Sequence, residues 1–134
     1  MQILRHRTAL LRRRFSGPVQ LLLDDGLLTT GTSFFDYGCG YGEDIKFLKK
    51  MQFNAAGWDP HYAPENQKKS AQIVNLGYIL NVIENPEERA QTLKAAFELA
   101  ENLLVVAVMI RASGPLVATE TSFGDGVLTS WNTF

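Results

Sequence analysis

The chain has 134 residues, of which 46% are hydrophobic and 20% charged, and its formal net charge is −1. This composition is typical of one globular domain and excludes a disordered, collagen-like or coiled-coil chain. The single cysteine excludes an internal disulfide framework and a cysteine-based zinc site, and we expect no metal. The longest apolar run, residues 103–110, is far shorter than the ~20 residues that cross a membrane. We therefore expect a cytoplasmic protein that makes no contact with membranes.

Residues 1–30 are expected to form a basic, helical N-terminal arm. Ser16 is predicted to cap a short helix that has Pro18 in its first turn and ends near Gly26. Residues 1–14 contain no acid and hold five of the 13 Lys and Arg residues. These arginines form either the solvated face of a helix or an electrostatic contact to a nucleic-acid backbone. They are Arg5, Arg7, Arg12, Arg13 and Arg14.

From residue 33 onward the pattern predicts strands that alternate with helices. Strands are expected over residues 33–37, 54–59, 72–78 and 103–110, and helices over 43–51 and from Pro86 onward. The last of these strands is apolar on both faces, which is typical of the centre of a parallel sheet. This alternation predicts an α/β fold: a three-layer, Rossmann-like, mostly parallel sheet over residues 31–112. Residues 113–134 are expected to be a polar tail, with a weak strand signal at residues 127–128.

In such a sheet, ligands bind at the carboxyl ends of the strands. Gly38, Gly40 and Gly42 follow the first strand and lead into a helix, where glycine permits a tight reversal and close approach of a ligand to the backbone. Asp59 ends the next strand, where a carboxylate can accept hydrogen bonds from both hydroxyls of a ribose. Glu43 stands where dinucleotide-binding folds have a third glycine, and its charge is a poor neighbour for a pyrophosphate. The pattern therefore favours the sulfonium cofactor S-adenosylmethionine over a nicotinamide or flavin nucleotide.

The segments FDYGCGYG at residues 35–42 and GWDP at residues 57–60 resemble the first two motifs of class I S-adenosylmethionine-dependent methyltransferases. Residues 81–86 resemble the segment after that family's fourth strand, and residues 103–108 resemble its fifth strand. Shorter segments along nearly the whole chain are similar to a bacterial group of methyltransferases associated with DNA phosphorothioation. These segments are residues 7–10, 16–18, 25–28, 74–78 and 124–126.

The resemblance implies a methyltransferase that uses S-adenosylmethionine in a DNA-modification setting, with an unknown methyl acceptor. DNA or DNA-modification proteins are the candidate partners of the N-terminal arginines. Two alternatives remain: a non-catalytic interaction module that keeps the cofactor site or only the fold, and, less favoured, a nucleotide-dependent oxidoreductase. Methyl transfer is an in-line displacement for which the protein mainly supplies orientation, and no catalytic triad is visible.

The resemblance also implies which residues bind the cofactor. The three glycines would line its methionine end, Asp59 would hold the ribose, and Asp36 would brace the glycine loop or contact the cofactor's amino group. Cys39 is expected to pack rather than to react. The complete expected set is Asp36, Gly38, Cys39, Gly40, Tyr41, Gly42, Asp59, Pro60 and Asn75.

The chain departs from the family pattern in two places. Between Asp59 and Ile73 the family has a helix and a strand with an acid that contacts adenine, whereas here only a polar loop is expected. Adenine recognition would then fall to backbone groups near residues 71–72. The family's closing hairpin is not recognisable in residues 111–134. We therefore expect a trimmed version of the class I methyltransferase fold, or a truncated piece of a longer protein.

Asn75 and Tyr78 are the candidate catalytic residues. Residues 75–78 stand where amino-methylating DNA enzymes carry an Asn/Asp-Pro-Pro-Tyr motif, in which the first side chain accepts from the target amine and the tyrosine stacks on the base. Both prolines are absent here, so the alternative is that Asn75 and Tyr78 line the cofactor pocket or pack at the sheet edge. His61 is either a general base or a solvent-facing side chain. Glu84 is either a helix cap or a substrate contact.

Overall fold

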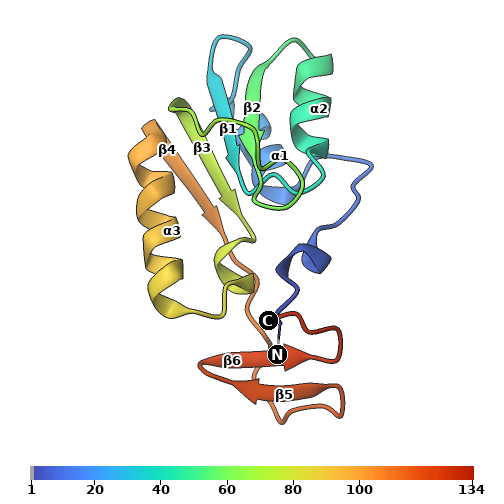
Figure 1. Ribbon diagram of the computed structural model, residues 1–134. Helices are drawn as coiled ribbons and strands as arrows, with labels where there is room; N and C mark the ends of the chain where they lie inside the picture. The colour runs from blue at the N-terminus through green and yellow to red at the C-terminus, as the bar shows by residue number, and fades with distance from the viewer. Residues whose placement is uncertain (1) are drawn as a thin grey trace.

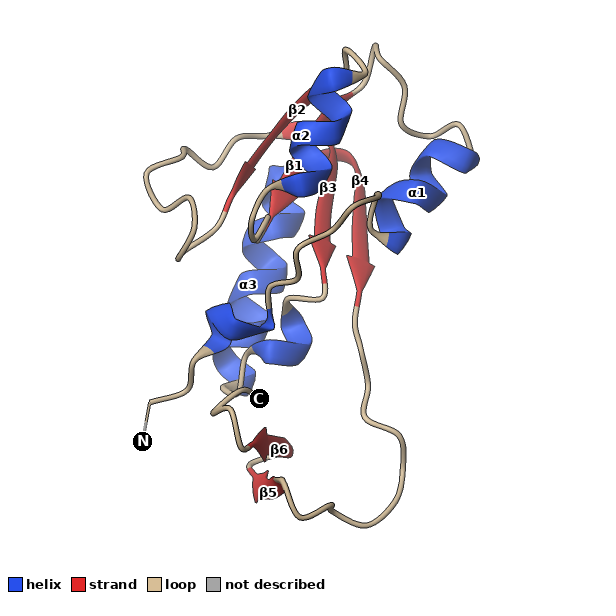
Figure 2. Ribbon diagram, turned by 90° about the vertical axis from the view of Figure 1, so that its right-hand side faces the viewer, coloured by secondary structure: helices blue, strands red, loops and turns tan. Residues whose placement is uncertain are grey.

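A computed structural model describes residues 2–134 and contains a parallel sheet flanked by helices (Figure 1). The strands of this sheet, in the spatial order β2-β1-β3-β4, are β1 (Ser33–Tyr37), β2 (Asn54–Trp58), β3 (Ala71–Gly77) and β4 (Ala100–Ala107). All neighbouring pairs are parallel. Helices α1 (Gly17–Asp24) and α2 (Glu43–Lys50) cover one face, and α3 (Pro86–Leu99) covers the other (Figure 2). The predicted three-layer α/β fold with a parallel sheet is confirmed.

The core divides into two halves because successive side chains of a strand point to opposite faces of the sheet. Phe34 packs with Val19 of α1 and Leu48 of α2 on one face. Phe35, its neighbour in β1, packs with Ala96 of α3 on the other. Helix α1, from the predicted basic arm, is thus part of the core, although the domain boundaries themselves stay predictions.

Strand β4 lies at an edge of the sheet, so its predicted central position is wrong. The strand begins at Ala100 and ends at Ala107, and the apolar residues that follow leave the sheet. Val108 and Ile110 are 49% and 84% exposed. A continuous apolar run predicts a strand without fixing the number of its neighbours, which depends on how the whole sheet assembles.

Ser16 stands at the N-cap of α1 as predicted, but its side chain makes no capping hydrogen bond there. Its backbone N–H and its hydroxyl instead donate to the Asp44 carboxylate, over 2.8 and 2.6 Å. A hydrogen bond to a carboxylate is stronger than one to a neutral acceptor. Ser16 therefore connects the N-terminal arm to the first turn of α2, and its side chain does not cap α1.

The C-terminal residues form a hairpin where the sequence predicts a polar tail. Strands β5 (Glu120–Phe123) and β6 (Gly126–Thr129) pair antiparallel in a small separate sheet. The weak strand signal at residues 127–128 falls within β6, where Leu128 is buried. Two short 3₁₀ turns complete the described chain, η1 (Arg5–Thr8) and η2 (Leu80–Val82). None of the helices within residues 2–134 is both long enough and apolar enough to span a membrane.

Candidate functional site

The glycine loop between β1 and α2 requires glycine for geometric reasons. Gly38, Gly40 and Gly42 have φ of +90°, +54° and +78°, a region that residues with a Cβ rarely adopt. A Cβ on Gly38 would also lie only 2.4 Å from the side chain of Ile79. The N–H of Gly38 donates to the carbonyl of Trp58 over 2.7 Å, which fixes the loop to the end of β2.

Asp59 is buried directly after β2 and braces two loops. Its Oδ2 accepts from the N–H of Gly40 over 2.9 Å. Its Oδ1 accepts from the N–H groups of His61 and Tyr62, each over 2.9 Å. A carboxylate oxygen has two lone-pair directions, so Oδ2 retains one for a ligand hydroxyl. The contact between Asp59 and a ribose stays a prediction.

Asp36 and Asn75 form a buried polar pair across β1 and β3, where their Cα atoms are register partners. Asn75 Nδ2 donates to Asp36 Oδ1 over 3.0 Å. Burial raises the pKa of Asp36 to about 7. Asn75 Oδ1 is buried and has no hydrogen-bond partner among the described residues. The pair therefore leaves one unused acceptor on Asn75, a residue that lines the cavity at the carboxyl ends of the strands.

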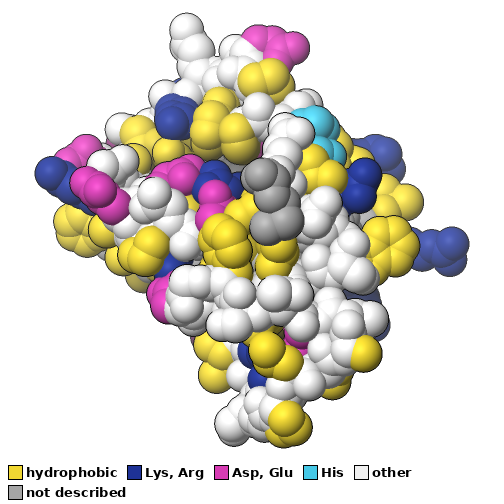
Figure 3. Space-filling model, turned by 60° about the horizontal axis from the view of Figure 1, so that its bottom comes forward, with side chains coloured by type: hydrophobic (Ala, Val, Ile, Leu, Met, Phe, Trp, Pro, Cys, Tyr) yellow, Lys and Arg dark blue, Asp and Glu magenta, His cyan; other side chains and the backbone are white. Residues whose placement is uncertain are grey.

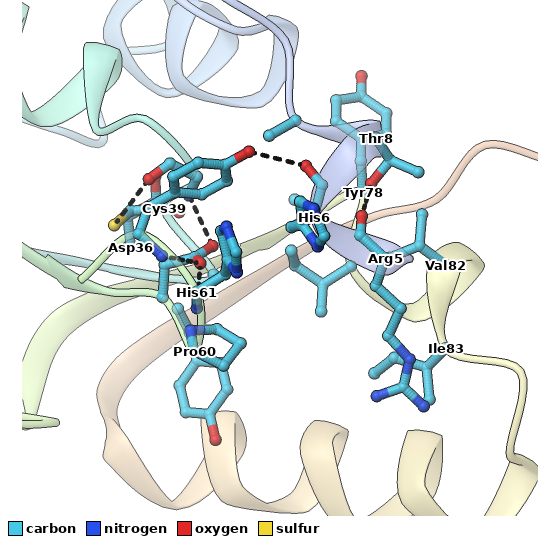
Figure 4. Close-up of a pocket in the computed structure, with 18 of the residues that line it drawn as sticks. Arg5, His6, Thr8, Asp36, Cys39, Pro60, His61, Tyr78, Val82 and Ile83 are labelled. Atoms are coloured by element: carbon cyan, nitrogen blue, oxygen red, sulfur yellow. Dashed lines mark hydrogen bonds between the residues drawn. The ribbon is translucent and has the colours of Figure 1, made fainter. Parts of the chain in front are cut away.

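A cavity of about 1220 Å³ lies at the carboxyl ends of the strands. It exceeds the ~300–1000 Å³ of typical small-molecule sites, so it has room for more than one ligand. Figure 4 shows Asp36, Cys39, Pro60 and His61 on one side of it. Every predicted site residue lines this cavity, namely Asp36, Gly38, Cys39, Gly40, Tyr41, Gly42, Asp59, Pro60, Asn75 and Tyr78.

Acidic side chains line the cavity near the glycine loop. Asp36, Asp44 and Asp59 are buried and line it. The charges of Asp44 and Asp59 add to the effect of burial in raising the pKa of Asp36. Burial, and then the same acidic surroundings, raise the pKa of the Cys39 thiol to about 12, which keeps it protonated. Among residues 2–134, no group of His, Cys, Asp and Glu side chains is arranged to hold a metal ion.

The arginines of the N-terminal arm do not form one surface. Arg5 is bound within the molecule by Glu84 and Glu88. The guanidinium of Arg12 lies 6.0 Å from the ring centre of Tyr78. The other three side chains belong to exposed residues, Arg7, Arg13 and Arg14. Only these three are free to contact a partner without breaking an interaction already present.

Glu84 does not cap the helix that follows it. Asn85 caps α3 instead, since its Oδ1 accepts from the N–H groups of Glu87 and Glu88. Glu84 accepts two hydrogen bonds from Arg5, each 2.8 Å long, and this pairing lowers the pKa of Glu84. The capping interpretation is wrong. A substrate contact is untested and would have to compete with Arg5.

The sequence left the roles of His61 and Tyr78 open, and the structure gives each of them a defined set of contacts. The His61 ring stacks on His6, with ring centres 4.0 Å apart and planes 11° from parallel. Tyr78 has a positive φ of +59°, rare for a residue with a side chain, and its N–H donates to the carbonyl of Ala107 over 2.7 Å. Both residues line the cavity, and His61 is at the same time exposed to solvent, whereas Tyr78 is half-buried.

Asp44 and His6 are cavity residues that the sequence reasoning missed. Asp44 had a local signal, because it is an acid in the first turn of a helix that opens from a glycine loop. His6 had none, since its position depends on the N-terminal segment folding back over the sheet. Residues 60–70 form a loop, as expected. Its Asn66 donates to the carbonyl of Gly57 over 2.9 Å.

Comparison of the chain with models of protein families, with curated proteins and with solved structures finds no match. The site is therefore interpreted from its own geometry and chemistry.

Proposed function

We propose that this chain binds S-adenosylmethionine in the cavity and transfers its methyl group, as class I methyltransferases do. The observation that carries the proposal is the hydrogen bond from the N–H of Gly40 to Asp59, over 2.9 Å. It joins the two sequence features that the cofactor requires, the glycine loop and the acid after the second strand, at one point of the cavity. A ligand bound there would meet both features at once.

The charge of the cavity supports the same cofactor. Buried Asp44 and Asp59, together with Asp36 in its ionised form, favour a ligand with positive charge at sulfur and nitrogen and disfavour a pyrophosphate, which would add negative charge. Glu43, which also lines the cavity, adds to this preference. The charge thus supports S-adenosylmethionine over a nicotinamide nucleotide.

The unpaired Asn75 Oδ1 gives a test of whether the site fits this cofactor, because a fitting ligand should donate a hydrogen bond to it. A buried acceptor without a partner is costly, so a ligand that donates an N–H there would relieve the cost. S-adenosylmethionine carries such a donor in its amino group, and when bound it supplies an activated methyl group. Asp36 accepts a hydrogen bond from Nδ2 of the same amide and, when ionised, would place negative charge beside that donor.

The methyl acceptor stays open, and a DNA-modification role is proposed from the resemblance in the sequence. The exposed Arg7, Arg13 and Arg14 support it as candidate contacts to phosphates. A cytoplasmic location likewise stays a prediction. The alternative, a non-catalytic module, is favoured by one feature. Beyond β4, the apolar residues 108–110 are exposed, which is typical of a surface that meets a partner.

Calorimetry with S-adenosylmethionine, S-adenosylhomocysteine and NAD tests the proposal. We expect saturable binding of both sulfur compounds and none of NAD. Binding without transfer of a labelled methyl group to DNA or protein would favour the non-catalytic module. Failure of both sulfur compounds to bind would refute the cofactor assignment, and binding of NAD alone would favour an oxidoreductase.

A further inference from the structure

Residues 3–12, here called the strap, run across the mouth of the cavity. Figure 1 shows the N-terminal segment beyond the carboxyl ends of the strands, near the C-terminal hairpin. In Figure 3, which views this side of the molecule, acidic and basic side chains lie next to each other and the histidines reach the surface. The strap residues that line the cavity are Ile3, Arg5, His6, Thr8, Ala9, Leu10 and Arg12.

Arg5 fastens one side of the strap to the start of α3. Its guanidinium donates four hydrogen bonds of 2.6 to 2.8 Å, two to Glu84 and two to Glu88. This planar, forked geometry is specific to arginine. The three side chains are 33%, 22% and 45% exposed, so water and salt compete with the contact. The attachment is specific in geometry, yet reversible.

The other side of the strap rests on the loops that form the cofactor site. The His6 ring stacks on His61, and the His6 carbonyl accepts from the hydroxyl of Tyr62 over 3.0 Å. Figure 4 shows His6 and His61 next to each other at the cavity. A Cβ on Gly40 would lie 3.5 Å from the Ala9 side chain, so the strap also touches the glycine loop.

The strap holds no apolar anchor of its own. None of residues 3–12 is buried, and Leu10 and Leu11 are 62% and 76% exposed. A segment with few buried contacts can detach while the sheet stays folded. By contrast, the chain just beyond it is held firmly by Ser16 on Asp44. The strap therefore has a fixed base, and polar contacts alone hold its outer end: the pairing of Arg5 with Glu84 and Glu88, and a hydrogen bond of 2.7 Å from the N–H of Leu4 to the carbonyl of Asn132.

We propose that the strap is a gate over the cofactor cavity, with the contact of Arg5 to Glu84 and Glu88 as its latch. In the closed state it covers the glycine loop and the loop after Asp59. Release of the latch lets the strap swing away and opens the cavity for the cofactor to bind or leave. The gate rests on the proposed function, since the cofactor is the ligand it controls.

Arg5→Ala removes the latch, and Arg7→Ala, in the same 3₁₀ turn but exposed, is the matched control. Hydrogen exchange of residues 3–12 in the ligand-free protein reports opening. Stopped-flow fluorescence reports the dissociation rate of S-adenosylhomocysteine, in a Trp131→Phe background that leaves Trp58 as the only tryptophan. Both rates should rise at least about tenfold with Arg5→Ala and stay within about twofold with Arg7→Ala.

A Glu84→Gln, Glu88→Gln double variant tests the latch from the other side and should reproduce both effects. If S-adenosylhomocysteine binds and neither rate changes in the Arg5 and Glu variants, the gate is refuted while the proposed function stands. If exchange accelerates and no variant or parent protein binds S-adenosylhomocysteine, the proposed function falls, and gating of this cofactor falls with it.

Discussion

The Oδ2 atom of Asp59 lies 2.9 Å from the backbone nitrogen of Gly40. This hydrogen bond spans two loops that follow neighbouring parallel strands, and it needs the carboxylate to act as an acceptor. The same side chain accepts from His61 and Tyr62 through its other oxygen. Asp59 thus organises the site before any ligand arrives.

Replacing Asp59 by Asn should weaken both the hydrogen bonds that hold the two loops and ligand binding at the proposed cofactor site. The amide can still accept with its oxygen, but its NH₂ group would face the N–H of Gly40. We expect the free energy of unfolding to fall by roughly 1–3 kcal/mol, measured by urea denaturation. The affinity for S-adenosylhomocysteine should fall by a similar amount. Asp25→Asn, at an exposed position after α1, is the control and should change neither quantity. An unchanged affinity in Asp59→Asn would remove Asp59 from the site.

Gly38→Ala should destabilise the fold through both backbone strain and a clash. The position has φ +90°, and the new Cβ would lie 2.4 Å from Ile79. Strain of this kind costs about 1–3 kcal/mol. Adding Ile79→Ala should relieve the clash and leave the strain, so the double variant stays less stable than Ile79→Ala alone. Gly31→Ala, where the nearest atom is 3.9 Å away, is the control for thermal unfolding. Equal stability of Gly38→Ala and the parent protein would contradict both the strain and the clash expected at this position.

Asp36 should make stability depend on pH in an unusual direction. Its folded-state pKa of about 7 lies above the ordinary 3.8, because the carboxyl is buried. Between about pH 4 and pH 7 the folded state therefore holds a proton that the unfolded chain has lost, so the free energy of unfolding falls as pH rises. Relative to an Asp36→Asn variant, the loss should be on the order of a few kcal/mol in urea denaturation. Parallel pH profiles of the two proteins would contradict this prediction.

Ser16→Ala and Asp44→Ala should loosen the junction between the N-terminal segment and α2. Ser16→Ala removes the hydroxyl hydrogen bond of 2.6 Å and keeps the backbone one. Asp44→Ala leaves both donors unpaired in a buried place, so it should cost more, roughly 1–3 kcal/mol for each donor. Thr29→Ala, which breaks an exposed hydrogen bond, is the control and should stay within about 0.5 kcal/mol. A smaller loss for Asp44→Ala than for Ser16→Ala would show that the carboxylate is not the shared acceptor.

The exposed arginines, unlike Arg5, are expected to contribute to DNA binding. Neutralising Arg7, Arg13 and Arg14 together should weaken binding to duplex DNA and make its salt dependence shallower, by roughly 0.9 in log–log slope per lost phosphate contact. Combined replacement of Lys46, Lys49 and Lys50 by Ala, at exposed positions of α2, is the charge-matched comparison. Fluorescence anisotropy at several salt concentrations measures the slopes. A salt-independent affinity, or equal loss in the lysine variant, would leave the arginines as a solvated face.

Much of the architecture was predictable because it depends on local patterns. The alternation of strand and helix signals around residues 33–110 leads to a parallel sheet, and parallel strands place their carboxyl ends together. Gly38 and Asp59 each follow such a strand, so their meeting at one edge followed from the order of the elements. The positive φ values required by the loop are also local and are readable from the glycines themselves.

The tertiary structure alone decided which distant groups pair. Arg5 meets Glu84 and Glu88, and Ser16 meets Asp44, because the N-terminal segment folds back over the sheet. Which side chains meet at these positions depends on the path of the chain in three dimensions, and this path cannot be predicted from sequence periodicity. The edge position of β4 and the unpaired oxygen of Asn75 are also tertiary features. Within the described chain, β4 has no strand on its outer side and Asn75 Oδ1 has no hydrogen-bond donor. The amino-acid sequence determined the sheet and the place of the site, and the folded chain decided what covers that site.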